Sequence, residues 1–330
     1  MRRRTFIGSL GGVALAAALP RHSRAQQERV RRIGVLSGLA ESDPESQIRM
    51  AAFDRGLRDL GWIKGRNLQV DYRWAGDGPA LQEQVAQLIG LKPDLIFANS
   101  TPVAVALQAQ TRTLPIVFVQ VTDPIGQGLV ANLAQPGGNL TGLTNFEFSI
   151  GGKWIEILRE LAPRLERVAI VFNPGTAPFA PLFVQPIRAS AGAFAVAPSV
   201  VAARNAAGLD RMIDTFAQEP NGGLLVLPDV SAINHRQAII ALAARHRLPA
   251  IYPYRVFATS GGLVSYGSDM PDIYRRAASF VDRILRGGKP ATMPVETPTR
   301  FELVINLKSA KLLQIEVPAR LLALADDVIE

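Results

Sequence analysis

A glycine-rich segment near residue 125 has the spacing of a dinucleotide-binding loop. Gly126, Gly128 and Ala131 fit the pattern G-x-G-x-x-A and follow the apolar run PIVFVQV, so the backbone there could approach a pyrophosphate. In dinucleotide-binding proteins this loop follows the first strand of its domain, whereas here it follows the fourth. The dipeptide Asp123-Pro124, which separates strand and glycines, is typical of a helix start. We therefore expect a closely packed helix here, with Asp123 facing a ligand.

Other residue patterns that carry chemistry do not occur. The chain has no cysteine, which excludes disulfides and cysteine-based catalysis or metal binding. Neither a G-x-S-x-G elbow nor a G-x-x-x-x-G-K-[ST] loop is present, and the acidic residues are dispersed. Beyond residue 25 the histidines are His235 and His246, which lack the i, i+4 spacing of a helical metal pair. The sequence indicates a protein that is not an enzyme and uses no metal or cofactor.

The first 25 residues have the pattern of a secretory signal peptide. Three arginines at positions 2–4 precede an apolar stretch at 6–19, and S-R-A at 23–25 forms a small-x-small cleavage site. The apolar stretch is shorter than the roughly 20 residues that span a bilayer. The segment R-R-T-F-I also resembles a twin-arginine signal, so twin-arginine and general secretion both stay open. Without a cysteine for a lipid anchor, we expect a free periplasmic protein.

The charge of the mature chain does not indicate nucleic-acid binding. Removing residues 1–25 takes away five arginines and no acidic residue, which lowers the net charge from +8 to +3. The densest basic cluster lies at 29–32, just before the first expected strand. A nucleic-acid partner would require a longer basic stripe, so we expect none.

The remaining sequence alternates short β-branched runs with amphipathic stretches. Near-continuous apolar strands separated by helices are typical of parallel sheets covered on both faces. Two such arrays occupy about 30–143 and 144–264, and a further strand–helix unit and a closing segment follow. The fold class predicted is therefore α/β, with two doubly wound parallel-sheet lobes. Because such sheets bind ligands beyond the carboxyl ends of their strands, we expect the site in a cleft between the lobes.

Polar and aromatic residues follow most of the expected strands. Hydroxyls and helix amides there suit a carboxylate, Asp123 or Asp229 could pair with an ammonium group, and tyrosines offer surface to an apolar body. Any single one of them can also be a simple helix cap. The candidate ligand-binding residues are Ser37, Asn99, Ser100, Thr101, Asp123, Asn173, Asp229, Tyr254 and Tyr266.

Long segments of the mature chain resemble the substrate-binding proteins of ABC transporters, in the family that includes tryptophan- and tyrosine-binding members. The resemblance covers essentially the whole mature chain, and its most specific motifs are D-P-I-G-x-G-x-V with P-G-G-N-x-T-G. The segments that carry it include GLRDLGWIKGRNLQVDYRWA, DLIFANSTPVA, PIVFVQVTDPIGQGLVANLAQPGGNLTGLT, LPDVSAINHRQAIIALAARHRLPAIY, GGLVSYGSDMPDIYRRAASFVDRILRGGKPATMPVE and FELVINLKSAKLLQIEVPARLLALADDVIE.

The resemblance implies a type I periplasmic-binding fold, in which a hinge of three crossings joins two lobes that close on a ligand. It places 30–143 and 265–292 in the N-terminal lobe, and 144–264 and 293–330 in the C-terminal lobe. The crossings are expected near 142–145, 262–266 and 291–296. It further implies a monomer that delivers a small molecule to a membrane permease with its ATPase.

The ligand itself stays open. An amino acid or related carboxylate suits the strand ends, but the loop S-G-L-A at 37–40 has no aromatic residue to stack on an indole or phenol. Two alternatives remain: a periplasmic protein that presents its ligand to a sensory receptor, and an NAD-dependent enzyme. The latter would need a catalytic histidine or lysine beside the cofactor, and none is evident.

Overall fold

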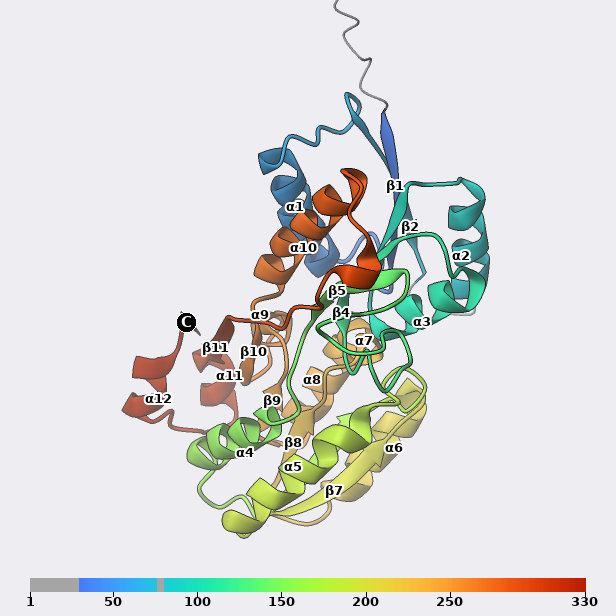
Figure 1. The fold of residues 1–330 in the computed structure, drawn as a ribbon. Coiled ribbons are helices and arrows are strands. Elements are labelled where there is room, and N and C mark those ends of the chain that lie inside the picture. The colour runs from blue at the N-terminus through green and yellow to red at the C-terminus, as the bar shows by residue number, and fades with distance from the viewer. Residues whose placement is uncertain (1–29, 76–79) are drawn as a thin grey trace, which may run out of the picture.

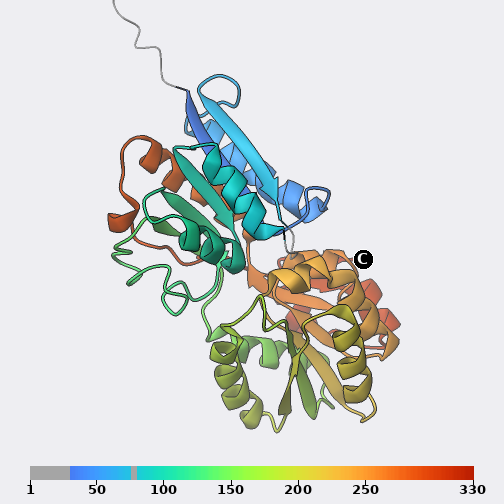
Figure 2. The same cartoon turned by 90° about the vertical axis from the view of Figure 1, so that its right-hand side faces the viewer.

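The computed structural model describes residues 30–75 and 80–330, which form two α/β lobes stacked end to end (Figures 1 and 2). The first lobe holds a parallel sheet in the order β2-β1-β3-β4-β5. Its strands are β1 (Arg31–Ser37), β2 (Leu68–Trp74), β3 (Leu95–Asn99), β4 (Ile116–Val121) and β5 (Leu140–Thr144). Its helices are α1 (Pro44–Asp59), α2 (Leu81–Gly90), α3 (Thr101–Gln110) and the late helix α10 (Met270–Leu285).

The second lobe holds a larger sheet in the order β12-β11-β10-β9-β8-β6-β7, parallel except for the β10–β11 pair. Its strands are β6 (Arg167–Phe172), β7 (Ala197–Ala202), β8 (Gly222–Val226), β9 (Ala250–Tyr252), β10 (Val264–Ser268), β11 (Phe301–Asn306) and β12 (Asp327–Ile329). Its helices are α4 (Ile150–Leu161), α5 (Ala180–Ala193), α6 (Ala206–Phe216), α7 (Val230–Asn234), α8 (Arg236–Arg245), α9 (Arg255–Thr259), α11 (Leu307–Leu312) and α12 (Ala319–Leu324). The predicted fold class is confirmed.

The chain passes between the lobes three times. It leaves the first lobe after β5, returns after β10, and leaves again after the short 3-10 helix η1 (Pro290–Thr292). The crossings lie side by side: Ser268 Oγ donates to the carbonyl of Asn145, and Asp269 N donates to the carbonyl of Arg300 at 3.2 Å. The predicted lobe boundary at 265 falls inside β10, whose five residues all pair in the second sheet.

Helix α10 returns to the first lobe and packs along α1 (Figure 1). Close approach is possible because Gly56 lies at the contact: a Cβ there would meet the carbonyl oxygen of Arg275 at 2.5 Å and the Cβ of Ala278 at 2.8 Å. Asp269 caps α10 by accepting from Asp272 N at 3.0 Å. The return helix therefore completes the core of the first lobe.

The segment after β4 is not the predicted helix. Residues 124–128 form turns, because Asp123 adopts a left-handed conformation (φ 54°) and its carboxylate accepts from Gly126 N at 2.9 Å. Gly128 also has a positive φ of 68°, which glycine adopts without strain. These glycines therefore shape a turn rather than a phosphate-binding helix start.

The predicted signal peptide, residues 1–25, lies outside the described residues. Among the helices of the described ranges, none combines the length and apolar character needed to cross a bilayer. Those same ranges contain no grouping of three or more histidine, aspartate or glutamate side chains suited to a metal ion.

Candidate functional site

Both sheets have a topological switch point whose strand ends face the space between the lobes. In the first sheet β1 lies between β2 and β3, and in the second β6 lies between β7 and β8, so successive connections leave in opposite directions. A crevice opens at such points beyond the carboxyl ends of the strands. Ser37 and Ser100 occupy the first crevice, and Asn173 and Asp229 the second.

A narrow cavity lies between the two crevices. The first lobe and the crossing after β5 contribute one wall, and the loops after β6, β8 and β9 contribute the other. Its free volume is ≈ 10 Å³, about enough for one water molecule. The lining residues are Ser100, Thr101, Pro102, Gln120, Thr122, Asn145, Thr176, Phe179, Pro228, Asp229, Val230 and Tyr254.

The lobes touch directly beside this cavity. Arg236 of α8 forms two hydrogen bonds to the Asp43 carboxylate ahead of α1, at 2.6 and 3.0 Å, and both side chains are largely buried. Asn234 Nδ2 donates to the carbonyl of Gly38 at 3.2 Å. A molecule much larger than water can enter the cavity only if the lobes separate at these contacts.

Ser100 has an unusual conformation at the cavity wall. Its φ of 96° and ψ of 154° fall in a region that essentially only glycine populates, at a strain of about 1–3 kcal/mol. The residue is 2% exposed, and its hydroxyl has no hydrogen-bond partner among the residues that the structure describes. Strained residues of this kind cluster at ligand-binding sites, and the buried hydroxyl is a free donor and acceptor.

Ser37, Asn99 and Thr101, three other predicted residues of the first lobe, support this wall. Asn99 Nδ2 donates to Ser37 Oγ at 3.1 Å, and the same oxygen accepts from Leu39 N. Thr101 Oγ1 accepts from Thr122 N at 3.1 Å. Thr101 lines the cavity, whereas Ser37 and Asn99 lie behind it and hold the strand ends together.

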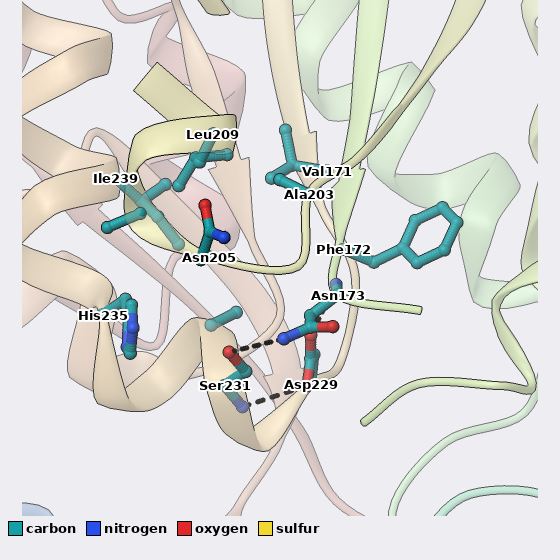
Figure 3. Close-up of a pocket in the computed structure, with 12 residues that line it drawn as sticks. Val171, Phe172, Asn173, Ala203, Asn205, Leu209, Asp229, Ser231, His235 and Ile239 are labelled. Carbon is teal, nitrogen blue, oxygen red and sulfur yellow. Dashed lines mark hydrogen bonds between the residues drawn. The ribbon is translucent and has the colours of Figure 1, made fainter. Parts of the chain in front are cut away.

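Asp229 lines both the interlobe cavity and a second hollow inside the second lobe, which Figure 3 shows. Its carboxylate accepts from the backbone N–H groups of Asn173 and Ser231 at 2.8 and 2.9 Å, and from Thr176 Oγ1 at 2.6 Å. Asn173 Nδ2 in turn donates to Ser231 Oγ at 3.2 Å. Asp229 thus organises the loops after β6 and β8 at the cavity wall.

The two predicted tyrosines have different positions. Tyr254 lines the cavity, and its hydroxyl accepts from Asn145 Nδ2 at 2.9 Å. Burial raises the pKa of Tyr254 to about 12, so the hydroxyl keeps its hydrogen at neutral pH. Tyr266 instead stacks on Phe301 in the second sheet and does not line the cavity. Asp123, whose carboxylate caps its own turn, also lies outside the cavity wall.

Several residues of the site were not predicted from the sequence, and three of them form hydrogen bonds or ring contacts with Tyr254: Gln120 and Asn145, which line the cavity, and Arg49, which lies behind it. Gln120 lies within β4, but a β-bulge between Phe118 and Val121 gives it a positive φ of 56°. Bulges redirect side chains in this way beside functional sites. Asn145 follows β5 at the first crossing, in the segment G-L-T-N that was expected to leave the lobe. An asparagine at a crossing was the signal that could have found it.

Arg49 is completely buried on α1. Its Nε donates to Glu45 at 2.6 Å and its Nη1 to Gln120 Oε1 at 2.5 Å. Within 30–75 and 80–330, Nη2 has no hydrogen-bond partner. The guanidinium also lies over the Tyr254 ring, 5.6 Å from its centre. Burial has the largest single effect on the pKa of Arg49 and lowers it, but the charge and hydrogen bond of Glu45, together with Tyr274 and Tyr254, raise it by more. The pKa therefore lies above its ordinary value, and Arg49 remains a cation.

The family model for "ABC transporter substrate binding protein" matches residues 34–329. The chain belongs to this family. A curated relative, the tyrosine-binding protein of Clostridioides difficile, is 26% identical over 268 residues, which cover 80% of this chain and 76% of the relative. The family and these neighbours are solute-binding proteins.

Solved structures of similar proteins share the whole fold. A conserved domain protein from Vibrio cholerae is 28% identical with a TM-score of 0.84, covering 91% of this chain and all of the other. A domain from Streptococcus pneumoniae in complex with L-Trp is 24% identical with a TM-score of 0.82, covering 91% and 99%. Both have the type I periplasmic-binding architecture.

A third solved structure, the ligand-free, open structure of a substrate-binding protein from Clostridium difficile, is 24% identical with a TM-score of 0.66, covering 91% of this chain and 99% of the other. In the present structure the two lobes are in contact through the Arg236–Asp43 pair.

Proposed function

We propose that this protein is an exported solute-binding protein that captures a small organic carboxylate, such as an amino acid, between its lobes. The protein then delivers this ligand to the permease and ATPase of an ABC transporter. The observation that carries the proposal is the interlobe cavity, where the strained, unpaired hydroxyl of Ser100 and the Asp229 carboxylate meet from opposite lobes. These groups suit the two ends of a zwitterion, and we assign the ligand contacts to this wall.

Capture depends on a difference in affinity between two lobe arrangements. A ligand that touches both walls stabilises the closed arrangement by the free energy of those contacts. The permease would then recognise the closed monomer, because both lobes present their surfaces together only in that arrangement. Two similar proteins support an amino acid as the ligand: one is a tyrosine-binding protein, and the other was solved in complex with L-Trp.

Export is the other part of the proposal. The basic and apolar pattern of residues 1–25 supports secretion to the periplasm, by the general or the twin-arginine route. Fractionation of cells that express the full chain checks this. Mature protein in the periplasmic fraction is expected, and full-length protein retained in the cytoplasm would contradict export.

Two experiments test ligand capture. Native mass spectrometry of freshly purified protein comes first, and thermal-shift measurements with amino acids, aromatic acids and small peptides follow. A bound small molecule and an increased melting temperature with at least one carboxylate are expected, since a ligand that binds only the folded state stabilises it. If no compound of a broad panel raises the melting temperature, the proposed function is wrong. NAD and NADP serve as negative controls.

A further inference from the structure

Hydrogen-bond directions around Tyr254 are fixed by a residue that does not line the cavity. Arginine carries N–H donors and no acceptor, so the Gln120 atom 2.5 Å from Arg49 Nη1 must be the carbonyl oxygen Oε1. The amide nitrogen of Gln120 is therefore turned toward Tyr254, and it donates to the Tyr254 hydroxyl oxygen at 3.4 Å. Arg49 thus sets which end of Gln120 faces the cavity.

A second amide donates to the same hydroxyl. Thr122 Oγ1 donates to Asn145 Oδ1 at 2.9 Å, which leaves the Asn145 amide nitrogen to donate to Tyr254 at 2.9 Å. A tyrosine hydroxyl has one hydrogen to give besides its capacity to accept. With two amides donating to it, the oxygen of Tyr254 is occupied as an acceptor, and its own hydrogen is left for another group.

We propose that Arg49 is a positioning residue that makes Tyr254 a hydrogen-bond donor to the carboxylate of the ligand. This inference rests on the proposed function and specifies how one end of the ligand is recognised. Tyr254 and the free hydroxyl of Ser100 line the same cavity, so both can donate to a carboxylate held there. The ammonium end of a zwitterion would lie against the Asp229 carboxylate, which lines the same cavity.

The alternative is that Arg49 serves packing alone, by joining α1 to β4 and to the rings of Tyr254 and Tyr274. Both roles include the Arg49–Gln120 hydrogen bond and the amide direction that it sets, but packing alone gives that direction no effect on the ligand. The two roles differ in what happens when Gln120 becomes a carboxylate. Gln120→Glu keeps the size and strengthens the contact with Arg49, yet a carboxylate can only accept. Tyr254 would then donate to residue 120 rather than to the ligand.

The test measures the affinity of the whole mature protein by calorimetry, with L-tyrosine, L-tryptophan and a panel of other carboxylates as probes. Each probe is paired with its amine, such as tyramine or tryptamine, which lacks the carboxylate. We expect carboxylates to bind at least tenfold more tightly than their amines. Tyr254→Phe and Gln120→Glu are each expected to lower carboxylate affinity about tenfold or more.

The double variant separates positioning from simple charge repulsion. If Gln120→Glu acts through Tyr254, then adding it to Tyr254→Phe lowers affinity no further, whereas repulsion would add to the loss. Arg49→Gln, which can donate or accept, is expected to weaken binding. Lysine, like arginine, carries donors only, so Arg49→Lys should retain most of the wild-type affinity.

The outcomes are distinguishable from failure of the proposed function. Carboxylate binding that is unchanged in Tyr254→Phe, or losses that add in the double variant, would overturn this inference and leave solute capture intact. An amine that binds as tightly as its paired carboxylate would also overturn it. If the wild-type protein binds no probe of the panel, the proposed function fails, and this inference fails with it. Melting temperatures of all variants establish that each one is folded.

Discussion

Ser100 joins two features that packing alone does not require, a glycine-like backbone conformation and a buried hydroxyl without a partner. The conformation arises where β3 ends and α3 begins, and Ser100 Oγ lies where a side chain at Gly38 would have to go. The strain persists because the surrounding strand ends hold the residue in place, and we interpret it as the result of aiming the hydroxyl at the cavity.

Substitutions of Ser100 separate strain from ligand binding. Ser100→Gly is expected to be more stable than Ser100→Ala by about 1–2 kcal/mol. Glycine relieves the backbone strain that alanine keeps, and the greater flexibility of glycine in the unfolded chain offsets part of that gain. Both variants lose the hydroxyl, so both should bind the ligand about tenfold more weakly. Denaturant unfolding and calorimetry check this. Equal stability of the two variants would show that the backbone there is not strained.

Buried tyrosines predict how stability depends on alkaline pH. Burial raises the pKa of Tyr252, Tyr254 and Tyr274 in the folded state above the ordinary value of about 10. Their contribution to stability is therefore complete below pH 10 and is lost as pH rises further, by up to about 1.4 kcal/mol per pH unit for each tyrosine. Denaturant unfolding from pH 9 to 11 should show this slope. Tyr252→Phe should make it shallower, and an unchanged slope would contradict the assignment.

At the scale of elements, the contact between α8 and the N-terminus of α1 holds the lobes together. Arg236 is the residue to change, because Asp43 also caps α1 by accepting from Glu45 N. Arg236→Gln is expected to favour the open arrangement and to increase the radius of gyration in solution scattering. Arg245→Gln is the matched control on α8, since Arg245 is half exposed and pairs with Asp210 and Asp214 inside its own lobe. An equal radius in both variants would contradict the assignment.

The packing of α10 on α1 gives a second prediction at this scale. Gly56→Ala is expected to destabilise the protein by about 1–3 kcal/mol, because the new methyl group meets the backbone of α10. Gly90→Ala in α2 is the control, since a Cβ there meets no atom within 4 Å. The control should be neutral or stabilising by up to about 1 kcal/mol. Similar losses in both variants in denaturant unfolding would exclude close packing as the cause.

The element pattern was readable from the sequence because strand and helix periodicities differ and parallel strands are apolar throughout. The strand ends Ser100, Thr101, Asp229 and Tyr254 follow from it directly, and all four line the cavity. Gln120 could not be found this way, because a bulge changes the direction of its side chain inside the strand. Arg49 could not be found either, since charged residues on helices ordinarily face water.

At the scale of the whole molecule, the switch points of two sheets face each other, and three adjacent crossings allow the lobes to separate and close. The cavity between them is small in this arrangement, while a larger hollow, with a volume of ≈ 800 Å³, lies at the opposite end of the second lobe. Size alone would favour the larger hollow as a binding site. The strained backbone and the unpaired hydroxyl of Ser100 favour the interlobe cavity as the binding site instead.

One measurement decides between them: calorimetric titration of the ligand that stabilises the wild-type protein into two tryptophan variants. Thr176→Trp fills the interlobe cavity, and Glu316→Trp fills the hollow at the other end of the second lobe. We predict that Thr176→Trp abolishes binding and that Glu316→Trp binds like the wild type. Unchanged binding by Thr176→Trp, or loss of binding in Glu316→Trp alone, would contradict ligand capture between the lobes.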